Sequence, residues 1–127
     1  MKEVVATKNA PEAIGPYSQA IRCGNLLFVS GQIPIDPKSG GVVDGGIEKQ
    51  TEMVLRNLGA ILEAAGAGLG DVVKCSCFLR NMEDFPRFNA IYGTVFTVAP
   101  PARETVEVSR LPKDVLVEVS AICVIPA

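Results

Sequence analysis

The feature that most constrains the fold is the alternation of residue types in the last quarter of the chain. Residues 104–110 and 115–124 carry apolar side chains at every second position, which predicts two β-strands, because successive side chains of a strand point to opposite faces of a sheet. The intervening Leu111-Pro112-Lys113-Asp114 has the length of a hairpin loop. We therefore expect an antiparallel hairpin in which Arg110 pairs with Val115.

This pairing gives the hairpin two different faces. One face is aliphatic and is expected to meet the helices as core: Val106, Val108, Val115, Val117, Val119, Ala121 and Cys123. The other face mixes ionisable and hydroxyl groups with aliphatic ones: Arg103, Thr105, Glu107, Ser109, Leu116, Glu118, Ser120, Ile122 and Val124. A helix-free sheet face of that composition should not stay in water, so we expect identical subunits to bury it.

Earlier in the chain, turn signals and apolar periodicity predict a hairpin and a helix. Residues 17–22 and 26–31 flank Gly24-Asn25, a pair suited to a tight turn between two strands. Apolar residues between Ile47 and Ala65 fall on one helical face, and Gly66 follows where a C-terminal cap belongs. The proline- and glycine-rich stretch between the hairpin and the helix is expected to be a loop.

The middle of the chain predicts a further strand and a second helix. Residues 71–80 alternate as a strand, and Asp84 is placed to cap the helix that follows. That helix has an apolar face made of Phe85, Phe88, Ile91, Tyr92, Val95 and Phe96. The order of elements predicts an α+β fold with a single mixed sheet and both helices packed on one face. A length of 127 residues suits one domain, spanning 1–127.

Charge and hydropathy exclude several classes of protein. Twelve Lys and Arg residues against 14 Asp and Glu give a net charge of −2, which makes nucleic acid an unlikely partner. The first twenty residues lack the apolar run of a signal peptide, and no stretch approaches a membrane span. The protein is expected to be cytoplasmic, with no membrane association.

The residue inventory also limits the chemistry. The chain has no histidine, so Ser-His and Cys-His nucleophiles are excluded. None of the four cysteines, Cys23, Cys75, Cys77 and Cys123, forms a Cys-x-x-Cys pair, and we interpret them as small buried hydrophobic residues. No metal site is predicted.

Arg103 and Glu118 are the candidate catalytic residues on the mixed face. Arg103 follows Pro100-Pro101-Ala102 and could bind a carboxylate through its planar fork. It could instead be a surface residue, or form an ion pair between subunits with Glu107 or Glu118. Glu118 is a charge within an apolar strand, where it could pair with Arg103 or orient a water. An adjacent arginine would lower the pKa of Glu118 and favour water positioning over base catalysis.

Four further residues are candidates only in combination. Tyr17 follows the rigid Gly15-Pro16 step, Ser30 and Gly31 end a strand, and Asn89 lies in the second helix. Each of them taken alone is more often structural than functional.

These residues occur together in motifs that resemble the RidA/YjgF family, the reactive intermediate imine deaminases. The resemblance spans nearly the whole chain through Gly15-Pro16-Tyr17-Ser18-Gln19-Ala20, Phe28-Val29-Ser30-Gly31-Gln32-Ile33-Pro34, Asp71-Val72-Val73-Lys74, Pro101-Ala102-Arg103, Leu111-Pro112-Lys113 and Val117-Glu118-Val119. It implies a chorismate-mutase-like α+β fold assembled as a homotrimer with clefts between subunits. It also implies hydrolysis of 2-imino or enamino acids, such as 2-aminoacrylate and 2-iminobutanoate, to 2-keto acids and ammonia, without a metal or cofactor.

The resemblance also assigns roles to single residues. Arg103 would bind the substrate carboxylate and Glu118 would hold the attacking water. The substrate-binding cleft would further contain Tyr17 from the neighbouring subunit, together with Ser30, Gly31, Asn89 and Thr105. Thr105 stands where family members often have cysteine, and Glu104 stands where they usually have a small residue. Alternation should direct Glu104 to the other face of the strand. If the start of the strand is irregular, an anion at position 104 could still weaken carboxylate binding or alter substrate choice.

Three other functions remain open at this stage. A regulatory module could bind 2-keto acids with the same Arg103 and never turn over. An endoribonuclease or translation inhibitor is disfavoured by the missing histidine and the negative charge. Chorismate mutase would share the fold, but its dianionic substrate needs more than one cationic group.

Overall fold

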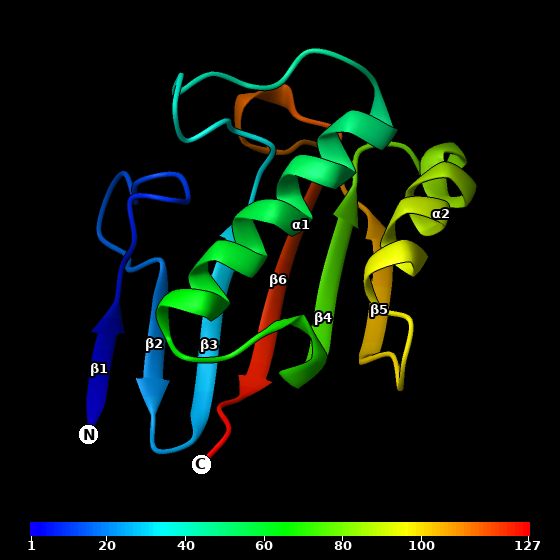
Figure 1. The fold of residues 1–127 in the computed structure, drawn as a ribbon. Coiled ribbons are helices and arrows are strands. Elements are labelled where there is room, and N and C mark those ends of the chain that lie inside the picture. The colour runs from blue at the N-terminus through cyan, green and yellow to red at the C-terminus, as the bar shows by residue number, and fades with distance from the viewer.

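The computed structural model describes residues 1–127 as one mixed β-sheet with two helices on the same face (Figure 1). The sheet has six strands in the order β1-β2-β3-β6-β4-β5. The elements are β1 (Lys2–Val5), β2 (Ala20–Cys23), β3 (Leu26–Gln32), α1 (Ile47–Ala64), β4 (Val72–Leu79), α2 (Phe85–Val95), β5 (Ala102–Glu107) and β6 (Val117–Val124). Short 3-10 helices cover Leu69–Asp71, Met82–Asp84 and Pro112–Asp114. The predicted α+β class and the placement of both helices are confirmed.

Helix α1 forms and ends as its sequence predicts. Its apolar stripe is fully buried, with Leu58, Ile61 and Leu62 at 0% exposure. At its end, Gly66 has φ +81°, its N–H donates to Glu63 O, and the N–H of Ala67 donates to Leu62 O. This pair of hydrogen bonds satisfies two carbonyls that the last helical turn would otherwise leave free.

The first hairpin is also confirmed. Strands β2 and β3 pair antiparallel around Gly24, whose φ of +62° suits a two-residue turn. Strand β1 has no counterpart among the predicted elements, and it pairs antiparallel with β2 at the edge of the sheet. Its four residues are too few to show a period of two.

The predicted final hairpin is wrong. Strand β5 pairs parallel with β4, and β6 inserts between β3 and β4, antiparallel to both. The connection between β5 and β6 contains the 3-10 turn at Pro112–Asp114, where Lys113 and Asp114 both have positive φ. Alternation within a strand defines its two faces, but it does not define which strand lies beside it. The sequence pattern was therefore correct for each strand and insufficient for their pairing.

The true pairing moves Arg103 to the other face of the sheet. Arg103 lies beside Cys75 and Thr105 beside Cys77, and both cysteines are buried under the helices. Glu118 lies beside Phe78 on the helix-free face. The expectation that Arg103, Thr105 and Glu118 share one face is therefore wrong, because β5 takes its orientation from β4 and not from β6.

Two further assignments change with this register. Val106, expected in the core, is 42% exposed on the helix-free face, and Val108 lies beyond the end of β5. The predicted core face of β6 is confirmed, since Val117, Val119 and Cys123 are 0% exposed.

Asp84 occupies the predicted N-cap position of α2 but makes no capping hydrogen bond. Its Oδ1 instead accepts a hydrogen bond from Arg87 Nη2 at 2.7 Å.

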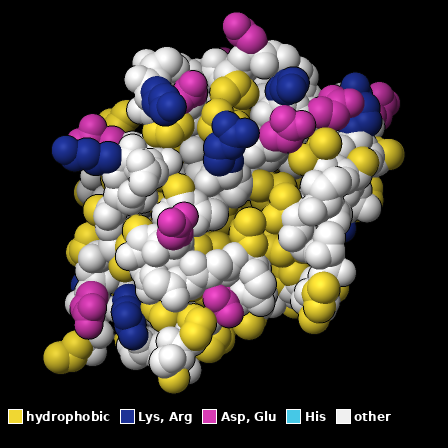
Figure 2. Space-filling view, in the orientation of Figure 1, with side chains coloured by type: hydrophobic (Ala, Val, Ile, Leu, Met, Phe, Trp, Pro, Cys, Tyr) yellow, Lys and Arg dark blue, Asp and Glu magenta, His cyan; other side chains and the backbone are white.

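The helix-free face has the composition expected of a covered surface. Its exposed large apolar side chains include Leu26, Phe28, Val106 and Val124. Phe28 and Ile122 are neighbours across β3 and β6, and Phe78 lies on the next strand. On the opposite, helix-covered face, Figure 2 shows hydrophobic side chains in the furrow between α1 and α2. Neither helix is long and apolar enough to cross a membrane.

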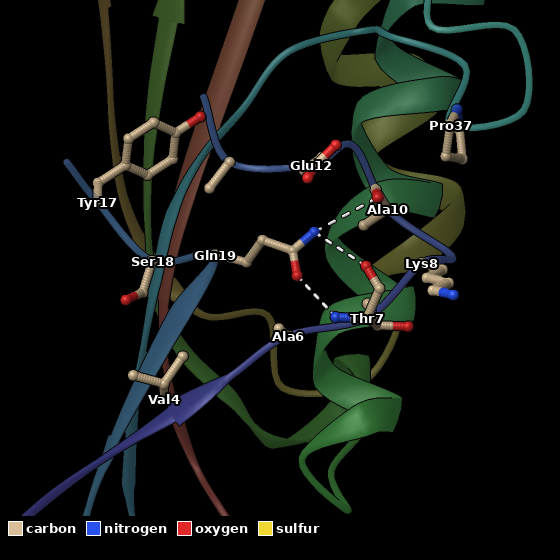
Figure 3. Close-up of a pocket in the computed structure, with 11 residues that line it drawn as sticks. Val4, Ala6, Thr7, Lys8, Ala10, Glu12, Tyr17, Ser18, Gln19 and Pro37 are labelled. Atoms are coloured by element: carbon tan, nitrogen blue, oxygen red, sulfur yellow. Dashed lines mark hydrogen bonds between the residues drawn. The ribbon is translucent and has the colours of Figure 1, made fainter. Parts of the chain in front are cut away.

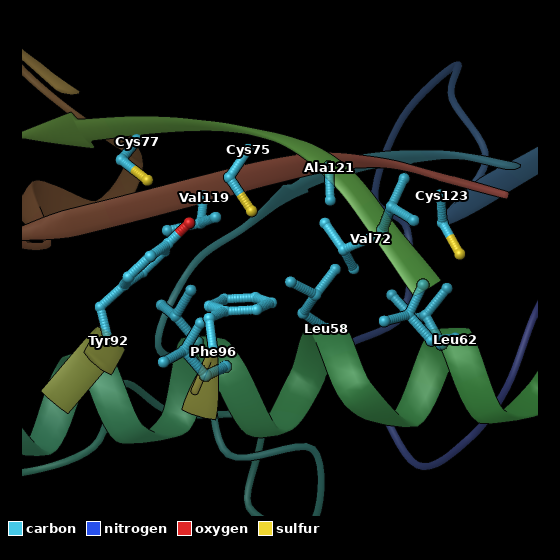
Figure 4. Close-up of a cluster of buried hydrophobic side chains, with 14 of the residues drawn as sticks. Leu58, Leu62, Val72, Cys75, Cys77, Tyr92, Phe96, Val119, Ala121 and Cys123 are labelled. Carbon is cyan, nitrogen blue, oxygen red and sulfur yellow. The ribbon is translucent and has the colours of Figure 1, made fainter. Parts of the chain in front are cut away.

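The cysteines divide into three buried residues and one exposed residue. Cys75, Cys77 and Cys123 lie in the core that α1 and α2 form with the sheet (Figure 4). Burial raises the pKa of Cys77 to about 12 and that of Cys123 to about 11, so these thiols stay protonated at neutral pH. Cys23 is exposed at the β2–β3 turn, which corrects the interpretation of all four as buried.

Candidate functional site

Arg103 extends from the edge strand β5 toward helix α2, where its guanidinium is enclosed by three side chains. Nη1 donates a hydrogen bond to Asn89 Oδ1 at 2.8 Å. The Cζ atom lies over the ring of Tyr92, 4.7 Å from its centroid, and over the ring of Phe85 at 5.5 Å. Aromatic faces attract cations, so both rings favour the charged group without neutralising it.

No carboxylate neutralises Arg103 within the chain. It takes part in none of the four ion pairs, which join Lys49 with Glu52, Lys74 with Glu104, Arg87 with Asp84 and Arg110 with Asp114. Glu107 accepts a hydrogen bond from the Met82 N–H instead, at 2.8 Å, and Glu118 lies on the opposite face. Neither Glu107 nor Glu118 therefore pairs with Arg103 within one chain. Nε and Nη2 have no hydrogen-bond partner in the chain, so they remain available for an anion.

Glu104 is directed away from Arg103. It lies on the helix-free face, where Ser76 Oγ donates to Oε2 and Lys74 Nζ lies 3.0 Å from Oε1. The hydrogen bond from Ser76, followed by that from Lys74, lowers the pKa of Glu104. The carboxylate is therefore ionised, locally compensated and separated from the guanidinium by the sheet. Its position beside Arg103 in the sequence does not place it in the carboxylate-binding region.

Thr105 lies two residues after Arg103 and on the same face as Arg103. Its Oγ1 is buried and has no hydrogen-bond partner. The hydroxyl of Tyr92 is also buried and also has no partner. Burial raises the pKa of Tyr92 well above its usual value, so this hydroxyl is protonated. Thr105 therefore shares the helix-covered face with Arg103, and its hydroxyl has no hydrogen-bond partner within the chain.

Glu118 and Gly31 are packed against each other on the helix-free face. A Cβ added to Gly31 would overlap Oε2 of Glu118 and lie 2.8 Å from its Cδ. Gly31 has no positive φ, so its backbone conformation does not itself require glycine, and a Cβ here would displace the end of the Glu118 side chain. No side-chain hydrogen bond or ion pair in the chain satisfies Glu118, and partial burial raises its pKa. The expected lowering of this pKa by Arg103 does not occur within one chain.

A β-bulge creates this arrangement. The register between β3 and β6 shifts by one residue between Val29 and Gln32, so Ser30 and Gly31 together oppose Ser120. Ser30 Oγ donates to Ser18 O at 2.6 Å, and the N–H of Ser30 donates to Gln19 O. Ser30 therefore fixes the segment that carries Tyr17 against the Glu118 side of the sheet.

Tyr17 is 52% exposed and projects from the loop between β1 and β2. Gln19 organises this loop: its Oε1 accepts from the Thr7 N–H at 2.7 Å, and its Nε2 donates to the carbonyls of Thr7 and Ala10 (Figure 3). The same Nε2 also donates to the carbonyl of Pro11. The loop borders an open cavity of about 740 Å³ that includes Tyr17, Lys8 and Glu12 in its lining. Tyr17 is thus presented to the outside by an anchored loop.

The candidate residues form two separate groups. The first group lies on the helix-covered side of the sheet, between α2 and β5, and consists of Asn89, Arg103 and Thr105. Tyr17, Ser30, Gly31 and Glu118 lie along β3, β6 and the preceding loop. Within a single chain, no hydrogen bond, ion pair or ring contact links the first group with the second.

Comparison with known proteins identifies the family. The family model described as Endoribonuclease L-PSP matches residues 7–125. The chain belongs to the RidA/YjgF family. A RutC family protein of Pyrococcus horikoshii is 59% identical over 122 residues, which cover 96% of this chain and 97% of that protein. A solved structure of a putative endoribonuclease from Thermotoga maritima has a TM-score of 0.97 and 53% identity, with all of both chains covered.

One relative in the RidA/YjgF family has a name that states an activity. The 2-iminobutanoate/2-iminopropanoate deaminase of Salmonella typhimurium is 47% identical to this chain over 127 residues, covering 98% of both chains. The family resemblance derived from the sequence motifs is therefore confirmed. The match extends across both groups of candidate residues, since residues 7–125 include Arg103 of the first group and Glu118 of the second.

Three residues around the RidA/YjgF site had no functional role in the sequence analysis. Phe85 and Tyr92 were assigned to the apolar face of α2, and Gln19 was only part of a motif. The missed signal was the spacing of Phe85, Asn89 and Tyr92, which puts them on one helical stripe. Nothing in the sequence pointed that stripe at Arg103, because the neighbour of β5 was predicted incorrectly.

Replacing Gly31 with alanine in this RidA/YjgF protein is expected to displace the Glu118 carboxylate. The added methyl cannot coexist with the present Glu118 position, so the side chain must rotate away. We expect a loss of turnover similar to that of Glu118→Gln, with a shift in melting temperature of only a few degrees. The double variant Gly31→Ala with Glu118→Gln separates the causes, because it should be no less active than either single variant. Additive losses in the double variant would show that Gly31 acts independently of Glu118.

Proposed function

We propose that this protein hydrolyses 2-imino acids, formed from enamino acids such as 2-aminoacrylate, to 2-keto acids and ammonia. The observation that carries the proposal is Arg103, a guanidinium held by an amide and two aromatic rings, with no carboxylate partner and two free nitrogens. Such a group fits a planar carboxylate through two parallel charge-assisted hydrogen bonds. A substrate carboxylate would supply the missing partner.

Hydrolysis of an imine needs few catalytic groups from the protein. The imine carbon is already electrophilic, so catalysis consists of placing a water molecule and moving protons. In this proposal Arg103 binds the carboxylate and the Glu118 carboxylate orients the water that attacks C2. The C–O bond forms as the C=N π electrons move to nitrogen, and the resulting carbinolamine expels ammonia as its C–N bond breaks. Glu118 takes a proton from the attacking water and gives it to the imine nitrogen. It then takes the proton of the carbinolamine hydroxyl and gives it to the amine, so that C=O forms as ammonia leaves.

The proposal requires two copies of the chain at each site. Arg103 and Glu118 are on opposite faces of one sheet, so one chain cannot place both against the same small substrate. We propose a homotrimer in which the helix-free face is covered by neighbours and each cleft combines Arg103, Asn89 and Thr105 with Glu118, Gly31, Ser30 and Tyr17 of a neighbour. The exposed apolar side chains Leu26, Phe28, Val106 and Val124 support this burial. We place this reaction in the cytoplasm.

Reconstitution of imine release tests the function. A pyridoxal-phosphate dehydratase acting on serine or threonine generates the enamine and imine in the assay mixture. The formation of keto acid is then followed with and without this protein. The proposal predicts faster keto-acid release. Unchanged release together with measurable binding of 2-oxobutanoate would identify the protein as a keto-acid-binding regulatory module instead.

RNA cleavage is the second candidate, since the matching family description names an endoribonuclease. The net charge of −2 and the absence of histidine do not favour binding or cleavage of an RNA backbone. Cleavage of a labelled RNA that persists through repeated purification and disappears in Glu118→Gln would support this candidate. The imine reaction is the better match to an uncompensated arginine.

The assembly can be tested with two identical substitutions on different surfaces. Val106 is 42% exposed on the helix-free face, whereas Val42 is 37% exposed in the loop before α1. Val106→Lys is expected to dissociate the trimer because it places a charge in the interface, and Val42→Lys is expected to leave the mass unchanged. Light scattering at micromolar concentration measures both. A wild-type protein that is monomeric there, or a Val106→Lys trimer, would contradict the proposed interface.

A further inference from the structure

The contacts of the Arg103 guanidinium all come from one stripe of helix α2. Phe85, Asn89 and Tyr92 are separated by four and then three residues, so they line one side of the helix. Asn89 fixes one guanidinium nitrogen, and the two rings lie against the planar group at 5.5 Å and 4.7 Å. The charged end of a long, flexible side chain is thereby held by three groups on a single rigid element.

The ring of Tyr92, and not its hydroxyl, makes the contact with Arg103. Tyr92 is 5% exposed, and its hydroxyl points inward toward Cys75 and Cys77 (Figure 4). That hydroxyl has no hydrogen-bond partner in the chain. It stays protonated, so Tyr92 offers a neutral ring face and no competing anion. Phe85 offers a second neutral ring on the same helical stripe.

Neutral aromatic contacts suit an arginine whose charge must remain available. A carboxylate in their place would hold the guanidinium equally well but would compete with an incoming anion. A ring face attracts the cation through its quadrupole and leaves the in-plane N–H groups free. Nε and Nη2 of Arg103 are unpaired in the chain, as this arrangement requires.

We infer that Phe85 and Tyr92 are positioning residues for carboxylate recognition: their rings hold the Arg103 guanidinium in the orientation that binds the ligand carboxylate. This inference rests on the proposed function, because it assigns the carboxylate-binding role to Arg103. It adds α2 to the site as the element that sets where the positive charge lies.

Two pairs of variants test the inference. Phe85→Leu and Tyr92→Leu remove a ring but keep an apolar side chain, whereas Phe85→Tyr and Tyr92→Phe keep the ring. We expect each leucine variant to raise the Kd for 2-oxobutanoate and the KM for 2-iminobutanoate together by about 3- to 10-fold, with kcat changed less than about twofold. The ring-preserving variants are expected to bind like the wild type. Calorimetry gives the Kd, and the coupled dehydratase assay gives KM and kcat.

The fold is monitored separately by the melting temperature. Tyr92→Leu is expected to lower it because the residue is buried, so Phe85→Leu, at the partly buried start of α2, carries the decisive comparison. A Phe85→Leu variant that binds 2-oxobutanoate as tightly as the wild type would overturn the inference. So would a Phe85→Tyr variant that binds as weakly as Phe85→Leu, because the ring would then not be the group that matters.

Arg103→Ala distinguishes this inference from the proposed function. If Arg103→Ala binds 2-oxobutanoate normally, the carboxylate-binding role fails, and the role of the rings fails with it. If Arg103→Ala loses binding while Phe85→Leu and Tyr92→Leu retain it, the proposed function stands and only the positioning role is overturned. Loss of binding in all three, with recovery in the ring-preserving variants, supports both.

Discussion

Replacing Arg103 with alanine is expected to lower kcat/KM for 2-iminobutanoate by about 30- to 5,000-fold, because removing one partner of a charge-assisted hydrogen-bonded pair costs about 2 to 5 kcal/mol. The affinity for 2-oxobutanoate should fall by a similar factor, since the same carboxylate is bound. The fold should be little affected, because Arg103 makes no ion pair and is only partly buried. Steady-state kinetics, calorimetry and a melting curve measure the three effects.

Arg110→Ala is the matched control for this prediction. It removes the same side chain and the same unit of charge, but from an exposed residue that is paired with Asp114 at 2.8 Å. Activity is expected to remain within about twofold of the wild type, since exposed ion pairs contribute little. Equal losses in both variants would mean that net charge, and not a carboxylate bound at Arg103, governs the reaction. Retained activity in Arg103→Ala would contradict the proposed mechanism outright.

Much of the fold was predictable because it depends on local patterns. The stripe of α1, the Gly66 cap and the Gly24 turn each depend on a few neighbouring residues, and all are confirmed. The pairing of β5 was not predictable in this way. Strands β4 and β5 are separated by the whole of α2, so their parallel pairing is a tertiary choice that alternation does not encode.

The same distinction applies to the site. Sequence motifs identified Arg103 and Glu118, but the predicted hairpin placed them on one face, where an ion pair was the simplest explanation. The parallel pairing of β5 separates them, and this separation is more informative than the expected contact. It leaves a guanidinium without an anion and a partly buried carboxylate without a cation in each chain. In the proposed assembly the substrate lies between the two groups, with its carboxylate on Arg103 and its reacting carbon near Glu118.

Glu104 shows how a local departure from a family pattern is accommodated. The sequence predicted that alternation directs Glu104 away from Arg103, and that this anion weakens carboxylate binding only if the start of the strand is irregular. In the structure, strand alternation directs Glu104 to the opposite face, where Lys74 and Ser76 bind it. Both partners come from β4, which pairs with β5. The prediction of the alternation was therefore right for Glu104, although the prediction of its neighbouring strand was wrong.

The second large effect is expected from Glu118→Gln, which keeps the size of the side chain and removes its ability to accept a proton. Turnover should fall by roughly 100- to 10,000-fold, the usual contribution of a positioned acid or base. Binding of 2-oxobutanoate should change less than about twofold, because Arg103 holds the carboxylate. The contrast with Arg103→Ala, which loses binding, separates the two roles in one set of calorimetric and kinetic measurements.

The stability of Glu118→Gln provides an independent check on the environment of this carboxylate. Burial raises the folded-state pKa of Glu118 above its ordinary value of 4.5. The protonated form is thus favoured in the folded state, so the contribution to stability is full below about pH 4.5 and is lost as pH rises through the folded-state pKa. At pH 7 the charged side chain costs stability, and Glu118→Gln should melt at an equal or higher temperature than the wild type.

This gain in melting temperature should shrink as the pH is lowered toward 4, where Glu118 becomes protonated in the wild type as well. A variant that is much less active and yet at least as stable as the wild type at pH 7 is the signature of a carboxylate kept for chemistry and not for folding. Lower stability of Glu118→Gln at pH 7 would instead show that a cation pairs with Glu118 in the assembled protein. In that case Glu118 would be a structural ion-pair partner whose pKa is lowered, and its proposed role as proton acceptor would be wrong.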